Sequence, residues 1–145
     1  MGLWRYCKEF ADTGRFVLQH ASGPVAPIPA YYLYCHAVEL GLKAFLRGKG
    51  WTLKQLRGLG HNLASALSEA DKAGLGGFCR LAPHLTHAIQ VVSPVYCDKQ
   101  FEYITTGLKQ LPQITDLQAG AEQLVLQLER FCYDHRTVHD ATGGV

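Results

Sequence analysis

The clearest pattern of hydrophobic and polar positions lies in residues 32–46, a nearly all-apolar run that carries one narrow polar line. That line consists of His36, Glu39, Lys43 and Arg47. At about 100° per residue, the last three side chains fall within roughly 60° of the first, and apolar residues flank them on both sides. A helix with this pattern is expected to be covered on both flanks, so the polar stripe would line a crevice or a subunit interface. The alternative is an ordinary ion pair between Glu39 and Lys43, with Arg47 reaching into solvent.

Apolar positions recur at helical spacing over most of the rest of the chain, and prolines and glycines separate the segments. Helices are expected at residues 3–19, 30–47, 53–59, 62–74, 83–94 and 116–132. No segment shows the alternation typical of a strand, and no repeat is present. The pattern therefore predicts an all-α antiparallel bundle of about five helices.

Several residues are expected to set the ends of these helices. Thr52 and Asn62 are predicted N-caps because their side-chain oxygens can accept hydrogen bonds from free backbone N–H groups. Pro94 is predicted to kink or end its helix. The final helix is expected to be capped by Thr115 or Asp116.

The chain has 145 residues, which favours one domain, assigned here to residues 1–139, with a flexible tail at 140–145. Its 48% hydrophobic and 18% charged residues leave apolar surface that a small monomer would expose, which favours an oligomer.

A net charge of +2 is too small to indicate a nucleic-acid-binding protein by its overall field. Any contact with RNA or a nucleotide would have to be local.

The chain contains five cysteines, an odd number, with no C-x-x-C pair among them. This pattern indicates neither a disulfide framework nor a zinc site and is typical of a reducing compartment. No apolar run is long enough to span a bilayer. We therefore expect a cytoplasmic protein without a membrane contact.

Three stretches occur in a characteristic order: HAVELGLKAFLRGKG, then LGHNLASALSEADKAGL, then VYCDKQFEY before the final helix. Together they resemble the HEPN family of small prokaryotic helical-bundle proteins over residues 31–128. The resemblance implies an antiparallel bundle, usually dimeric, linked to nucleotide or RNA biology. Such proteins are often encoded beside a small nucleotidyltransferase in toxin–antitoxin pairs, so a nucleotidyltransferase partner is also implied.

Many members of this family are metal-independent RNA endonucleases that use an Arg-x4-6-His motif brought together across the dimer. In this chain Arg130 and His135 have the matching spacing. The resemblance would make His135 the general acid or base and Arg130 the clamp on the phosphate. A five-residue step turns a helix by about 140°, however, so the two would share a face only if the helix ended between them. Phe131 also stands where active members usually have a small polar residue.

Other residues are candidates for binding. The stripe could hold a nucleotide phosphate, with His36 oriented by its neighbours. His61 is expected to cap a helix start or to contact the stripe. In the element around Tyr96, Gln100 replaces the arginine typical of the family, and the aromatic residues there are interpreted as packing anchors.

Two looser patterns complete the candidates. Arg136 and His139 form a second possible Arg–His pair, and histidines at 84 and 87 or at 135 and 139 have spacings that could ligate zinc. Neither histidine pair has a glutamate between its members, so we expect no metal and no cofactor.

We expect a homodimeric HEPN-like module that binds RNA or a nucleotide in a toxin–antitoxin or defence system, with a degenerate catalytic motif. Two alternatives remain. One is an active endoribonuclease toxin using Arg130 and His135, and the other is a structural protein–protein interaction module without a ligand.

Overall fold

The computed structural model describes residues 2–102 and 110–135. Within these ranges the chain forms six α-helices, one short 3-10 turn and no strand. The elements are α1 (Gly2–Gln19), α2 (Ile28–Gly48), α3 (Leu53–Gly58), α4 (Leu63–Lys72), η1 (Leu75–Gly77), α5 (Pro83–Cys97) and α6 (Ile114–Asp134). The all-helical class predicted from the sequence is confirmed for these residues, which form six helices where about five were expected. The expected domain boundaries stay predictions, and the expected tail at 140–145 lies outside the described residues.

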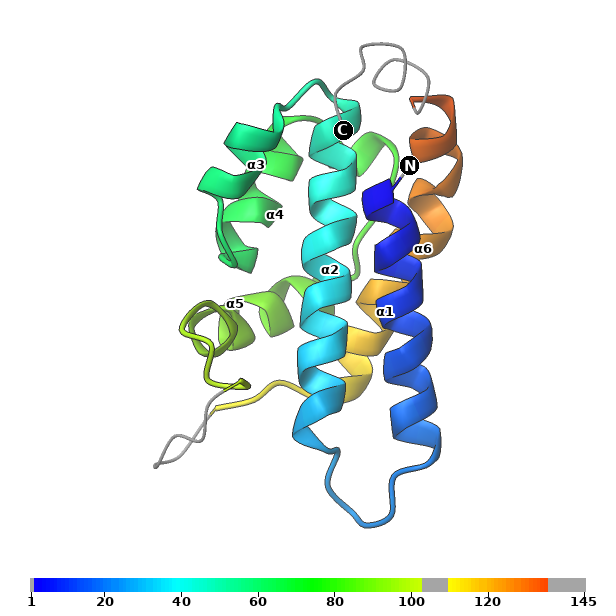
Figure 1. Cartoon of the computed structure of the whole chain (residues 1–145), viewed down its shortest axis with the longest axis vertical. Helices are drawn as coiled ribbons and strands as arrows, with labels where there is room; N and C mark the ends of the chain where they lie inside the picture. The colour runs from blue at the N-terminus through cyan, green and yellow to red at the C-terminus, as the bar shows by residue number, and fades with distance from the viewer. Residues whose placement is uncertain (1, 103–109, 136–145) are drawn as a thin grey trace.

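The long helix α2 lies at the centre of the fold (Figure 1). It packs antiparallel to α1 and beside α6, while α3 and α4 contact its other side. Both apolar flanks of its polar stripe are covered, as predicted. Leu42 and Leu46 on one flank are fully buried, and on the other flank Ala37 is fully buried and Leu40 is 9% exposed. Because α2 is buried on two sides, its polar stripe lies where the neighbouring helices meet.

Local sequence signals explain most of the helix ends. The Thr52 hydroxyl accepts a hydrogen bond from the backbone N–H of Gln55, whose side chain accepts one from the backbone N–H of Thr52 in return. Asn62 caps α4 by accepting from the backbone N–H of Ser65. Both predicted N-caps are therefore confirmed, because capping depends only on residues within one turn.

Pro94 does not end its helix, one of the two outcomes predicted for it, and the predicted cap of the last helix is wrong; the kink, the other outcome at Pro94, stays a prediction. The helix α5 passes through Pro94 and ends at Cys97, because Pro94 is exposed and the buried Val95 and Tyr96 keep the last turn against the core. The last helix begins at Ile114 and not after a cap at Thr115 or Asp116. Ile114 packs against the core, which draws the first turn inward.

The helices α1 and α6 are joined by polar contacts as well as by packing. The indole N–H of Trp4 donates to the carbonyl of Val125 at 2.9 Å. The guanidinium of Arg15 donates from Nε and Nη2 to one carboxylate oxygen of Glu122, each at 3.0 Å. These contacts fix α6 along the side of α1, with its outer face exposed.

Candidate functional site

The polar stripe of α2 is largely inside the protein. Glu39 is 3% exposed, and the side chains of Lys43 and His36 are 12% and 22% exposed. Arg47 at the end of the stripe is half-buried. The i,i+4 ion pair predicted for Glu39 and Lys43 is present, but it is buried, and a buried carboxylate needs further hydrogen-bond partners for its remaining acceptor sites.

The carboxylate of Glu39 receives partners from three parts of the fold. Lys43 Nζ donates to Oε1 at 2.7 Å. His61 Nδ1, just before α4, lies 3.1 Å from Oε2, and the hydroxyl of Tyr96 on α5 donates to the same oxygen. His36 Nδ1 lies 3.5 Å from Oε2. We call these five residues, His36, Glu39, Lys43, His61 and Tyr96, the Glu39 cluster.

The hydrogen bonds keep Glu39 ionised. Burial alone raises the pKa of the carboxyl, but its contacts with His36, Lys43, Tyr96 and His61 outweigh this effect and lower its pKa to about 2. Burial and the neighbouring Glu39 carboxylate both raise the pKa of Tyr96, so its hydroxyl keeps the proton that it donates. The cluster therefore contains a permanent buried anion balanced by the Lys43 ammonium.

This arrangement also assigns the protons on the two histidines. A carboxylate only accepts, so His61 Nδ1 must carry the hydrogen that points to Glu39. Tyr96 gives its only proton to Glu39, so its oxygen accepts from His36 Nδ1 at 2.9 Å. In each neutral ring the remaining nitrogen, Nε2, is then a lone-pair acceptor and a possible base.

Aromatic neighbours hold both rings in place. Phe10 meets the ring of His36 edge-on at 4.4 Å, and Tyr32 stacks parallel to it at 5.9 Å. The ring of His61 lies edge-on to Tyr96 at 5.7 Å, and its side chain is 42% exposed. The contact of His61 with the stripe, one of the two roles predicted for it, is present.

The two cations of the stripe already have partners within the chain. Lys43 Nζ also donates to the carbonyl of Gly60 at 2.7 Å, and Arg47 Nη1 donates to the carbonyl of Trp51 at 2.8 Å. These bonds tie the segments after α2 and α3 back to α2. A phosphate at the stripe would have to compete with them.

Tyr96 is the residue whose role the sequence reasoning missed. The sequence predicts a packing anchor, and the residue is indeed buried at 3% exposure, but its hydroxyl enters the polar cluster. The sequence does contain a signal for this role. Tyr96 is four residues after Val92, on the apolar face of α5, and a buried tyrosine hydroxyl usually needs a hydrogen-bond partner. Gln100 lies in the turn after α5, outside this cluster, and Tyr103 lies outside the described residues.

Arg130 and His135 lie at the C-terminal end of α6, and no contact joins them within the described chain. The Arg130 side chain is 94% exposed, and its Nε is 3.8 Å from Asp134. His135 Nδ1 is 2.7 Å from the carbonyl of Phe131, and its ring lies 4.1 Å from the Phe131 ring. The helix extends to Asp134, so the two residues keep the angular separation that a regular helix gives them.

Of the remaining candidate pairs, only His84 and His87 lie wholly within the described residues. His84 and His87 are both exposed on α5, and the described residues contain no group of three side chains able to hold a metal ion. His139 and Arg136 lie outside the described residues. All five cysteines are free thiols, and only Cys97 is exposed.

Comparisons of the chain with protein-family models, with curated protein sequences and with solved structures found no match. Among the described residues, no helix has both the length and the apolar character needed to cross a membrane. The functional assignment therefore depends on the sequence resemblance and on the geometry given above.

Proposed function

We propose that this chain is a HEPN-like, homodimeric binding module of a cytoplasmic toxin–antitoxin or defence system that associates with RNA or a nucleotide and does not cleave RNA itself. The observation that carries the proposal is the separation of Arg130 from His135 within one chain, so that cleavage would need one of the two groups from the partner. Arg130 extends into solvent beside Asp134, whereas His135 turns back onto the ring and carbonyl of Phe131. Catalysis by such a pair requires both groups at one phosphate.

The two partly exposed imidazoles of the Glu39 cluster are the proposed ligand contacts. His36 and His61 both have Nδ1 occupied within the protein, which leaves Nε2 as the polar atom available to a ligand. A neutral Nε2 accepts a hydrogen bond from a ribose hydroxyl or a base amino group, and a protonated one donates to a phosphate. Lys43 and Arg47 serve mainly to hold the fold in this proposal, because their donors are engaged with the chain.

Binding and cleavage can be measured separately. Light scattering at tens of micromolar protein tests the dimer, and thermal melting with and without short RNA or nucleotides tests the ligand. We expect a dimer, a raised melting temperature with at least one of these ligands, and no RNA cleavage in EDTA. A monomer would contradict the homodimer, and unchanged melting with every ligand would favour a structural protein–protein interaction module. Co-purification with a nucleotidyltransferase encoded by a neighbouring gene would support the toxin–antitoxin setting.

A second candidate is an active metal-independent endoribonuclease. One observation favours it: the Phe131 carbonyl fixes the proton of His135 on Nδ1, which leaves Nε2 free to act as a base, and the guanidinium of Arg130 is exposed. The 2′-hydroxyl of a ribose would then lose its proton to His135 as its oxygen attacks the adjacent phosphate. The bond from phosphorus to the 5′-oxygen of the next nucleotide would break, which gives a 2′,3′-cyclic phosphate and a 5′-hydroxyl that takes its proton from His135 or from water. This candidate predicts RNA cleavage in EDTA by the wild type and its loss in His135→Ala. Equal cleavage by both proteins, or by neither, would exclude it.

A further inference from the structure

Tyr34 on α2 has a buried hydroxyl with no hydrogen-bond partner among the described residues. The residue is fully buried, and the hydroxyl-bearing carbon of its ring faces α1 at Gly14, where an added Cβ would lie 3.0 Å from it. The hydroxyl of Tyr31, on the same helix, does have a partner, because it donates to the carbonyl of Pro112 at 3.0 Å. Burying a hydroxyl without a partner costs free energy, so the Tyr34 hydroxyl points to a partner from outside the chain.

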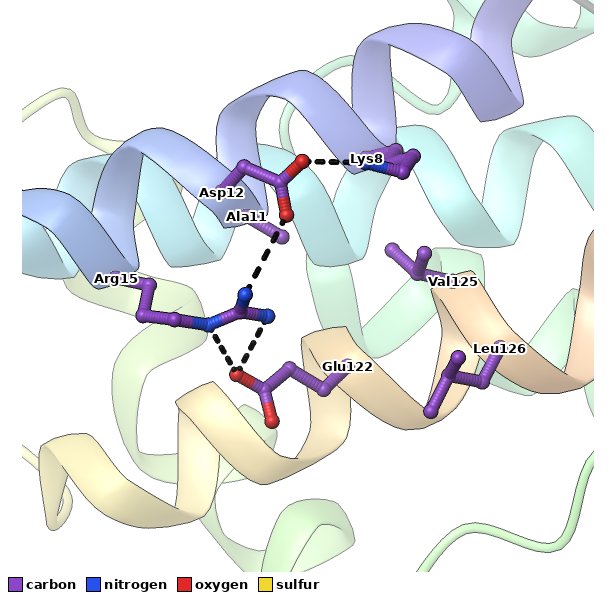
Figure 2. A pocket seen from close by; sticks show the side chains of 7 residues that line it. All are labelled: Lys8, Ala11, Asp12, Arg15, Glu122, Val125 and Leu126. Atoms are coloured by element: carbon purple, nitrogen blue, oxygen red, sulfur yellow. Dashed lines mark hydrogen bonds and ion pairs between the residues drawn. The ribbon is translucent and has the colours of Figure 1, made fainter.

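Two charged residues that act on this hydroxyl also line a hollow between α1 and α6 (Figure 2). Burial and the Glu122 carboxylate raise the pKa of Tyr34 to about 12, and the guanidinium of Arg15 opposes them. In Figure 2, Arg15 extends from α1 and Glu122 from α6, and the two meet at the edge of the hollow. The hydroxyl therefore lies close to the wall that this pair forms. It keeps its proton at neutral pH, so it can act as a donor.

The hollow is small and carries both apolar and charged groups. Its volume is ≈ 240 Å³, the room that about eight waters occupy in the liquid, so it suits only a small ligand. Its apolar lining consists of Ala11, Val125 and Leu126. Its charged lining consists of two cations and two anions: Lys8, Arg15, Asp12 and Glu122. These charges pair with one another and sum to zero, which favours an uncharged ligand.

We propose that this hollow binds a small uncharged molecule with an apolar body and one carbonyl oxygen, of the kind found in a short branched amide. The body contacts the apolar lining, and the oxygen accepts a hydrogen bond from the hydroxyl of Tyr34. Arg15 supplies a second donor, because it uses Nε and Nη2 for Glu122, while its Nη1 is 3.8 Å from Asp12, beyond hydrogen-bond distance. The site lies apart from the Glu39 cluster and does not depend on the proposed function.

The ligand reaches the hydroxyl when the pair of Arg15 and Glu122 rotates aside. Their side chains are 44% and 33% exposed, and ion pairs this exposed contribute little to stability. Rotamer changes of exposed side chains take only picoseconds to nanoseconds. A ligand carboxylate would meet the carboxylates of Asp12 and Glu122, and a ligand ammonium would meet Lys8 and Arg15. A charge of either sign on the ligand therefore weakens binding.

Three probes with one carbon skeleton test the ligand class: isovaleramide, isovalerate and isoamylamine. We expect isovaleramide to shift the backbone amide NMR signals of Ala11, Gly14 and Val125, with a dissociation constant on the order of millimolar, as is usual for so small a ligand. The two charged probes should bind roughly fivefold more weakly or less. Equal binding of all three probes would overturn the ligand class, and shifts confined to other parts of the chain would overturn the site.

The variant Tyr34→Phe tests the hydroxyl itself. It should bind isovaleramide roughly fivefold more weakly, and without ligand it should melt no lower than the wild type, because it removes a hydroxyl that lacks a partner. Tyr31→Phe is the matched control, since it loses the bond to Pro112 and should melt lower while binding isovaleramide as the wild type does. If Tyr34→Phe melted lower and bound isovaleramide unchanged, the partner of the hydroxyl would be a water molecule and the proposal would be wrong.

A variant at the rim tests the place of the ligand without touching the hydroxyl. Leu126 is 73% exposed, so Leu126→Asp should leave the fold intact. It removes an apolar contact and adds a charge to the hollow, and we expect it to weaken isovaleramide binding at least roughly threefold. Val25→Asp is the control, because Val25 is 78% exposed and lies in the connection between α1 and α2. Equal affinity of the two variants for isovaleramide would exclude this hollow as the binding site.

Discussion

The hydroxyl of Tyr96 on α5 donates a hydrogen bond to the buried carboxylate of Glu39 on α2. The same hydroxyl oxygen accepts a hydrogen bond from His36, so one tyrosine joins an anion and an imidazole. Because Glu39 also contacts Lys43 and His61, loss of any single member leaves another polar group buried without a full set of partners. Three predictions follow from this cluster, and a fourth concerns the packing of α6.

Removing the charge of Glu39 should strongly destabilise the protein. In Glu39→Gln the amide can accept at only one of the two former carboxylate oxygens, and the part-buried Lys43 ammonium loses its counter-ion. Breaking a buried ion pair in this way costs about 3–5 kcal/mol of unfolding free energy. Urea denaturation measures the change. The control is Glu9→Gln, which removes a carboxylate from an exposed pair with Arg5 and should cost less than about 1 kcal/mol.

Removing only the hydroxyl of Tyr96 should cost less but still be measurable. In Tyr96→Phe the ring still fills its buried site, while Glu39 loses a donor and the Nδ1–H of His36 loses its acceptor. We expect a loss of about 1–3 kcal/mol in the same denaturation experiment. Tyr6→Phe on the exposed side of α1 serves as the control and should have almost no effect. Equal stability of Tyr96→Phe and the wild type would show that the hydroxyl contributes nothing.

Stability should fall in acid through Glu39. The ordinary pKa of its carboxyl is 4.5, and the folded protein lowers this pKa to about 2. A group with a lowered pKa in the folded state binds its proton more readily when unfolded. The contribution of Glu39 to the free energy of unfolding is therefore present above pH 4.5 and is lost as the pH falls toward 2. The free energy of unfolding lost over this range is about 3 kcal/mol. Denaturation curves between pH 6 and pH 2 should therefore show a steeper decline for the wild type than for Glu39→Gln.

A methyl group at Gly120 should disturb the packing of α6 on α5. A Cβ built at Gly120 would lie 2.2 Å from a methyl carbon of Leu85, which is itself 1% exposed, so the Leu85 side chain must shift to make room for it. Alanine favours helix by about 1 kcal/mol over glycine, but overpacking costs about 1–3 kcal/mol, so Gly120→Ala should be destabilising on balance. Gly58→Ala, where no atom lies within 4 Å, is the matched control. A melting temperature at or above that of the wild type for Gly120→Ala would contradict this packing.

The helices themselves could be predicted closely. The expected segment 3–19 corresponds to α1 (Gly2–Gln19), and the caps at Thr52 and Asn62 are in place. Helical periodicity and capping depend on residues within a few positions of one another, so these features can be read without knowledge of the fold. The predicted end at Pro94 and the predicted cap at Thr115 failed where burial of neighbouring side chains outweighed a local signal.

The site could be predicted only in part. The spacing of His36, Glu39 and Lys43 placed them on one line of α2, which depends on helix geometry alone. The partners of Glu39 could not be predicted in this way, since Tyr96 is 57 positions away and His61 is 22 positions away. Arg130 and His135 have the spacing of a catalytic motif, but the sequence does not show which partner each side chain takes.

By itself, the sequence determined that the described chain is helical, which faces of the helices are apolar, and that α2 carries a polar line between two covered flanks. Only the tertiary structure decided that this line surrounds a buried carboxylate, that Tyr96 belongs to it, and that Lys43 and Arg47 are held by backbone carbonyls. The reason is physical. Periodicity states which side of a helix avoids water, whereas the pairing of buried polar groups depends on how helices distant in the sequence pack, because each such group must find its partner wherever the packing places one.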